Sequence, residues 1–329
     1  MYILKKAVLC LGCVASLSIF WISSEARAAS AFPEQPIKMI VGFSAGSATD
    51  TVARVVAQDL SERIGQSVIV ENKTGAGGSI AADSVAKAKP DGYTLLFVSS
   101  AIAVIPSVYP KLTFDVEKDL IPISLVGRVP LVLLVNTSVP SKSIEEFVAL
   151  AKSTPGSLNY GSSGQGGSIH MSTELFSTVS KVKMTHIPYR GNGQAMAALL
   201  GGDVDVLMDT VINATPHLKS PKVRALAITG ENRSSLAPDI PTFREMGLPE
   251  FDATLFFGVM GPANLPTEVL NRLNREIAAG LKSKKVEARL SETGGLQLAG
   301  GKPEEFQDTL RRELTTWKKV AQDSKVSAQ

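Results

Sequence analysis

The segment Gly42-Phe43-Ser44-Ala45-Gly46 is the part of the sequence that comes nearest to a catalytic motif, because it fits the Gly-x-Ser-x-Gly pattern of an α/β-hydrolase nucleophile. It lies between a predicted strand and a predicted helix, as that pattern requires. A hydrolase also needs an earlier strand and loop to complete its oxyanion hole, and few residues precede this motif. A secreted α/β hydrolase or esterase that uses Ser44 is therefore the alternative to a binding function.

The same loop is suited to a second kind of chemistry, the binding of an anion by the backbone. Its small residues let N–H groups approach a ligand, and the helix expected from about Thr49 adds partial positive charge at that point. Residues 75–79 repeat this glycine-rich arrangement before the next predicted helix, and residues 161–170 repeat it again before a helix that starts at about Ser168. Neither repeat fits a dinucleotide fingerprint or a P-loop. Three such helix starts predict one shared cleft lined with hydrogen-bond donors.

Three side chains near these loops are further candidates for ligand binding. Arg190 follows a predicted strand, and its guanidinium fork fits a carboxylate, although a solvated surface arginine is the alternative. Asp209 ends another predicted strand, where ligands bind in open α/β sheets. His170 lies in the first turn of its predicted helix, where both a cleft-lining and a structural role remain open.

We expect neither a metal nor a cofactor. His170, His186 and His217 are far apart in the sequence and lack metal-ligand spacing, so structural roles are expected for His186 and His217. The only cysteines are Cys10 and Cys13, which lie in a segment that we expect to be removed. The mature chain should then have no disulfide and no thiol chemistry.

The first residues have the features of an export signal. Lys5 and Lys6 form a basic start, residues 7–22 are apolar, and Ala26-Arg27-Ala28 supplies a small-x-small cleavage site. The apolar run is short for a permanent span, which needs about 20 residues. We expect cleavage after Ala28 and a periplasmic protein; an uncleaved anchor is the alternative.

The charge balance argues against nucleic acid as a partner. The whole chain of 329 residues has a net charge of +3, and removal of the signal segment lowers it further. Nucleic-acid binding needs a clear excess of basic residues to neutralise phosphates. A small molecule is therefore the expected partner of the predicted cleft.

Strands and helices alternate in the first third of the chain. Strands are predicted at residues 37–41, 68–70 and 94–98, with helices at 52–64 and 80–88 between them. This β-α-β-α-β order implies a parallel sheet with right-handed crossovers.

A second α/β unit follows, and the chain then returns to the first. Its strands are predicted at residues 131–135, 183–187, 204–208 and 223–228. After it come a strand at 255–260 and two amphipathic helices at 269–281 and 306–320. If these helices cover the first sheet, domain 1 is discontinuous, with residues 29–129 plus 254–329, and domain 2 comprises residues 130–253. The two crossings, at 127–130 and 250–254, would form a hinge.

Several segments together resemble the extracytoplasmic receptors of tripartite tricarboxylate transporters, also called Bug proteins. The resemblance extends from about Phe32 to the C-terminal helix. The segments that show this resemblance are residues 36–50, 70–78, 90–95, 159–164, 186–191 and 238–242.

The resemblance implies a type II periplasmic-binding fold, in which two α/β domains close over a ligand. It further implies that the ligand is a small organic carboxylate, that the partner is a membrane permease, and that the protein is not an enzyme; we expect a monomer. It places Phe43–Asp50 in the first ligand loop, Ser162–His170 in its counterpart, and Asp209 in the cleft. The predicted ligand-binding residues are Phe43, Ser44, Ala45, Ser47, Thr49, Asp50, Gly77, Ser99, Ser163, Gly164, Gly167, Ser168, His170, Arg190 and Asp209.

Overall fold

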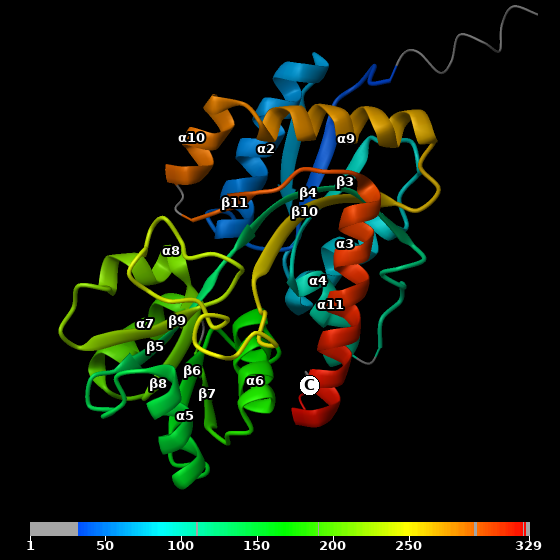
Figure 1. The fold of residues 1–329 in the computed structure, drawn as a ribbon. Coiled ribbons are helices and arrows are strands. Elements are labelled where there is room, and N and C mark those ends of the chain that lie inside the picture. The colour runs from blue at the N-terminus through cyan, green and yellow to red at the C-terminus, as the bar shows by residue number, and fades with distance from the viewer. Residues whose placement is uncertain (1–31, 110, 190, 293–294, 325, 327–329) are drawn as a thin grey trace, which may run out of the picture.

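Two β-sheets with helices on their faces form two lobes (Figure 1). The structure is a computed structural model that describes residues 32–109, 111–189, 191–292, 295–324 and 326. The predicted signal peptide, its cleavage site and Arg190 lie outside these residues.

The first sheet has six strands in the order β11-β4-β10-β3-β1-β2. These are β1 (Ile37–Val41), β2 (Val68–Asn72), β3 (Thr94–Ser99), β4 (Leu120–Val129), β10 (Leu255–Pro262) and β11 (Gln297–Leu298). β1 pairs in parallel with β2 and β3, which confirms the predicted parallel unit. The remaining pairings of this sheet are antiparallel, since β10 is antiparallel to β3 and β4 and β11 is antiparallel to β4. β4 and β10 connect to the other lobe rather than through crossover helices, so they are free to run in opposite directions.

Helices cover both faces of this sheet. Its apolar residues share one core cluster with α2 (Ala48–Ile64), α9 (Thr267–Leu281) and α10 (Lys284–Glu292). The opposite face is covered by α3 (Ser79–Ala86), α4 (Ala101–Val108) and α11 (Pro303–Ser324), with the short η2 (Ala76–Gly78) before α3. Both C-terminal amphipathic helices therefore lie on the first sheet, as their periodicity and the spare sheet surface predicted.

The second sheet has five strands in the order β7-β6-β8-β5-β9. These are β5 (Leu131–Asn136), β6 (Asn159–Ser162), β7 (Thr185–Pro188), β8 (Val206–Thr210) and β9 (Val223–Ile228). β6 runs parallel to β7 and β8, and β5 runs antiparallel to β8 and β9. The helices of this lobe are α5 (Ile144–Ser153), α6 (Ser168–Ser180), α7 (Asn192–Gly201), α8 (Val211–Ala214) and η3 (Thr215–His217).

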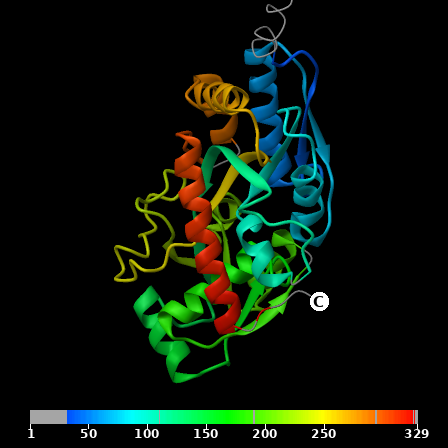
Figure 2. The ribbon, with the colours of Figure 1, turned by 90° about the vertical axis from the view of Figure 1, so that its right-hand side faces the viewer.

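The chain passes between the lobes twice. Pro130 alone separates β4 from β5, and residues 229–254 lead from β9 back to β10. The C-terminal helix α11 also reaches the second lobe, where it packs against α6 while contacting β4 and α4 of the first (Figure 2). In the described part of the chain, no helix combines the length and apolar character that a membrane span requires.

Candidate ligand-binding cleft

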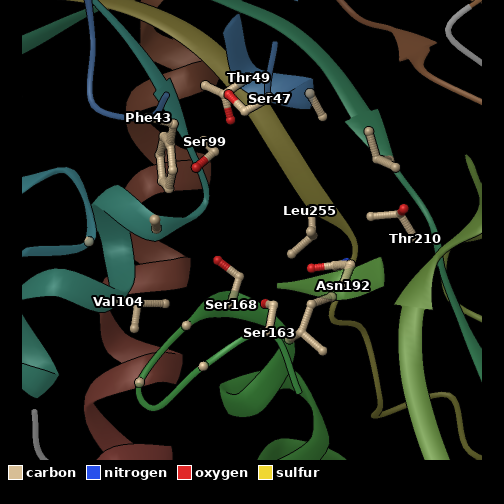
Figure 3. A pocket seen from close by; sticks show the side chains of 18 of the residues that line it. Phe43, Ser47, Thr49, Ser99, Val104, Ser163, Ser168, Asn192, Thr210 and Leu255 are labelled. Carbon is tan, nitrogen blue, oxygen red and sulfur yellow. The ribbon is translucent and has the colours of Figure 1, made fainter. Parts of the chain in front are cut away.

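A cavity of about 760 Å³ lies between the two lobes (Figure 3). The first lobe contributes the loop after β1, η2, α4 and part of β10, and the second contributes the loop after β6 and the starts of α7 and α8. A cavity of this size suits a small molecule. None of the described residues that line it has a charged side chain.

Three helices begin at the cavity wall. Residues 48–49 of α2, 168–169 of α6 and 192–193 of α7 all line it. The first N–H groups of a helix lack intrahelical acceptors, and the helix dipole concentrates partial positive charge there. An anion in the cavity would thus meet donors from both lobes without any basic side chain.

The loop after β1 is shaped by its small residues. Gly46 has φ +80°, which favours glycine, and the Ser47 hydroxyl caps α2 by accepting from the Asp50 N–H at 3.2 Å. A Cβ on Gly42 would lie 2.7 Å from the Cα of Gly78. The first two glycine-rich loops therefore touch, and only glycine permits that approach.

Asp50 fixes this loop from behind. Its carboxylate accepts from the N–H of Gly46 at 2.9 Å, from Arg54 Nε at 2.9 Å and from Asn72 Nδ2 at 2.8 Å. Asn72 Nδ2 also donates to the carbonyl of Phe43 at 2.9 Å. Asp50 is only 2% exposed, and burial acts to raise its pKa, but the hydrogen bonds from Arg54, Asn72 and Gly46 outweigh burial and hold the pKa below its usual value. Asp50 is therefore ionised, and it holds the loop in place without lining the cavity itself.

Two histidines fix the loop after β6. The N–H of Gly166 donates to His170 Nδ1 at 2.9 Å, and His186 Nε2 lies 2.6 Å from the Ser162 hydroxyl, which accepts from the Gly164 N–H at 3.1 Å. The two imidazoles stack with their centroids 3.8 Å apart. Histidines that are distant in the sequence thus meet here, but among the described residues no cluster has the makeup of a metal site.

The histidine pair is held neutral. Burial, with a contribution from His186, lowers the pKa of His170 to about 3, and burial lowers the pKa of His186 to about 4. Because Nδ1 of His170 accepts a hydrogen bond, the single ring proton lies on Nε2, 4.0 Å from the Glu174 carboxyl. Burial raises the pKa of Glu174, which also accepts from the Tyr160 hydroxyl. His170 is 2% exposed, so it has a structural role behind the loop.

A third buried group, Asp209, lies behind the second-lobe wall. Its Oδ1 accepts from the N–H of Thr210 at 2.7 Å, from Asn192 Nδ2, and from Asn213 Nδ2 at 3.3 Å, and all three donor residues line the cavity. Asp209 is 0% exposed, and its Oδ2 has no hydrogen-bond partner among the described residues. Burial raises its pKa to about 6, although these hydrogen bonds act to lower it.

The predicted site residues divide into three groups in the structure. Those that line the cavity are Phe43, Ser47, Thr49, Gly77, Ser99, Ser163, Gly164, Gly167 and Ser168. Asp50, His170 and Asp209 are buried behind its walls. Ser44 and Ala45 are exposed outside the set of lining residues.

Two parts of the wall were missing from the sequence prediction. One is apolar and consists of Val104, Ile105 and Val108 of α4 with the ring of Tyr109. The other is polar and comprises Asn192, Thr210 and Asn213. The rule that ligands bind beyond the carboxyl ends of strands would have indicated both, because α4 follows β3 and Thr210 ends β8.

Among the described residues of the first lobe, no histidine is available to activate Ser44 for hydrolysis. All three histidines belong to elements of the second lobe, and two of them are engaged with each other. Ser44 itself lies on an exposed turn of the first lobe, where its carbonyl accepts from the Ser47 N–H at 3.1 Å. The hydrolase alternative is therefore not supported.

Two α/β lobes with a donor-lined cavity between them define a solute-binding protein, which confirms the predicted fold. A family model described as the tripartite tricarboxylate transporter family receptor matches residues 52–325, so the chain belongs to this receptor family. Protein BugT of Bordetella pertussis is 37% identical over 298 residues, which cover 90% of this chain and 91% of BugT.

Two solved structures support the same assignment. R. palustris Rpa4515 with adipate is 34% identical, with a TM-score of 0.77 over 90% of this chain and 99% of that one. MatC (Rpa3494) from Rhodopseudomonas palustris with bound malate is 33% identical, with a TM-score of 0.74 over 88% of this chain and 99% of that one. These proteins bind solutes, and family membership identifies the chain as a receptor and not an enzyme.

Proposed function

We propose that the protein is a periplasmic receptor that captures a small organic carboxylate between its lobes and delivers it to a membrane permease of the tripartite tricarboxylate type. One observation carries this proposal: helix N-termini from opposite lobes line a cavity whose described walls have no charged side chain. Such donors satisfy a carboxylate, which accepts at both oxygens. The adipate and malate in the two related structures support the same ligand class.

The proposal assigns roles to the predicted residues. The nine predicted residues that line the cavity contact the ligand, while Asp50 and His170 position the two loops. Arg190 remains a predicted contact. The lobes correspond to residues 29–129 plus 254–329 and residues 130–253, with hinge segments at 127–130 and at 250–254.

The proposal also includes the form in which the protein works. It is exported, cleaved after Ala28, and monomeric, and it binds without a metal. The intact mass of the periplasmic form tests the cleavage site, because retention of residues 1–28 would contradict it. Dialysis against a chelator should leave carboxylate binding unchanged.

A thermal-shift panel on unfolded, dialysed and refolded protein tests the ligand class. Mono-, di- and tricarboxylates are compared with their amides and with sugars. A ligand that binds only the folded state adds about 2.7 kcal/mol at a hundredfold excess over Kd, which raises the melting temperature by about 2–4 °C per kcal/mol. We expect a carboxylate to give this shift and its amide to give none, because the amide lacks the charge and turns N–H groups toward donors. A response to sugars alone would overturn the proposal.

A further inference from the structure

The side-chain amides of Asn192 and Asn213, which line one wall of the cavity, have a fixed orientation. Both side-chain amides donate their Nδ2 groups to Oδ1 of Asp209. An ionised carboxylate only accepts hydrogen bonds, so this contact determines which end of each amide is nitrogen. The orientation of Asn192 is therefore set by a buried residue and does not depend on the ligand.

This orientation places one hydrogen-bond acceptor, the side-chain oxygen of Asn192, in a cavity where helix starts present N–H donors. With its nitrogen directed to Asp209, Asn192 turns its Oδ1 toward the cavity, where Figure 3 shows the oxygen on the open side. Asp209 adds negative charge directly behind this oxygen, and its buried Oδ2 has no partner in the part of the chain that the structure describes. A group placed beside Asn192 gains most if it donates a hydrogen bond or carries positive charge.

We propose that the ligand is a carboxylate that also carries a hydrogen-bond donor, either a hydroxyl or an ammonium group, and that Asn192 Oδ1 receives this donor. Asp209 acts as a positioning residue for Asn192. This inference rests on the proposed function, since the carboxylate is assigned to the helix N-termini of α2 and α6. It explains why an acidic residue lies so close to an anion-binding cavity.

An acid without a donor is disfavoured by the same geometry. When the lobes close, the Asn192 oxygen would lose water and gain no partner. A site built to hydrogen-bond one group of a ligand rejects the analogue that lacks it. The preference of Asn192 for an acid that carries a donor is therefore independent of the contacts that bind the carboxylate.

Calorimetric titration of refolded protein at pH 8 tests the inference with matched acids. The sets are propionate, lactate and alanine; succinate, malate and aspartate; and benzoate, 4-hydroxybenzoate and 4-(aminomethyl)benzoate. In the set that binds most tightly, we expect a donor-bearing member to bind about tenfold more tightly than the donor-free acid. Whether the hydroxyl or the amine member leads identifies the donor, and either result supports the inference.

Variants show whether Asn192 is responsible. Asn192→Leu should bring the donor-bearing and donor-free acids within about twofold of each other. Asp209→Asn, which allows the Asn192 amide to turn round, should also reduce the preference. Ser99→Ala, on the opposite wall, should change both acids alike and serves as the matched control.

The possible failures are distinct. If no carboxylate binds the wild-type protein, the proposed function fails. If carboxylates bind but the donor-free acid is as tight as its donor-bearing partner, only this inference fails. A preference that persists in Asn192→Leu would also overturn it.

Discussion

The loop after β1 and the loop after β6 each lead into a helix whose N-terminus lines the cavity, but the groups that fix them differ in charge. An ionised carboxylate, Asp50, holds the first loop with help from Arg54, whose side chain is 50% exposed. Two neutral, stacked imidazoles hold the second, with His170 bonded to the Gly166 N–H. Each loop thus has a side chain that accepts a hydrogen bond from one of its N–H groups, a charged carboxylate near solvent in the first loop and a neutral imidazole in the interior in the second.

This difference teaches how each lobe keeps its donors available for the ligand. In both loops the stabilising side chain accepts from an N–H group of the loop, Gly46 or Gly166, and not from the residues at the helix start that line the cavity. A charged group suits the first loop because Arg54 balances the charge of Asp50 and Asn72 donates a hydrogen bond to it. The second loop lies near the buried Tyr160 and the partly buried Glu174, where an unbalanced charge would be costly.

The largest expected effect is that of Asp50→Ala. It removes the acceptor that Gly46, Arg54 and Asn72 share, so the first loop loses its anchor to α2 and β2. We expect the free energy of unfolding to fall by about 2–4 kcal/mol and carboxylate affinity to fall at least tenfold. Urea denaturation and calorimetry measure both.

Arg54→Met is the control for this change. Because Arg54 is half exposed, its loss should cost less than about 1 kcal/mol. Equal costs for the two variants would show that the ion pair, and not the carboxylate, holds the first loop.

His170→Ala should have a somewhat smaller effect on the second loop. It leaves the Gly166 N–H without its acceptor and should cost about 1–2 kcal/mol in stability, with weaker carboxylate binding. His170→Asn should recover part of the affinity, since an asparagine oxygen can accept where Nδ1 did. The ratio of the two dissociation constants checks this, and a failure of asparagine to surpass alanine would refute the role of the acceptor.

Lowering the pH should change the stability cost of substituting His170, which holds the second loop, but not that of substituting Asp50, which holds the first. Burial lowers the pKa of His170 in the folded protein to about 3, so the unfolded chain takes up a proton on this ring first as the pH falls. The stability that the neutral ring contributes is therefore fully present above about pH 6.5 and is lost below it. Between pH 7 and pH 5 the cost of His170→Asn should shrink by about 1–2 kcal/mol. The cost of Asp50→Ala should stay constant, because the lowered pKa of Asp50 keeps it ionised over that range.

Urea denaturation of the wild type and both variants at the two pH values provides the measurement. His186, Glu174 and Tyr160, which face His170, are present in all three proteins, so their own titration largely cancels in the comparison. A His170→Asn cost that does not change with pH would contradict the neutral pair.

Much of this architecture could be predicted because local patterns determine it. The period of Val52, Val56 and Leu60 identified α2, and the glycine-rich segments located all three loops. β4 was missed because Pro122, Gly127 and Arg128 interrupt its apolar run, and β6 because it is short and polar.

The rest depends on contacts that sequence spacing does not encode. The stacking of His170 on His186 requires the pairing of β6 with β7. The orientation of Asn192 depends on Asp209, which belongs to another element. The position of Asp209 at the end of a predicted strand therefore indicated a cleft residue but not its role in directing an amide.

A crystal structure of the refolded protein with its tightest carboxylate tests the central claim most directly. The account predicts closed lobes, with the carboxylate within hydrogen-bond distance of N–H groups at the starts of both α2 and α6. A carboxylate bound by one lobe only, or held by basic side chains outside the cavity, would contradict it.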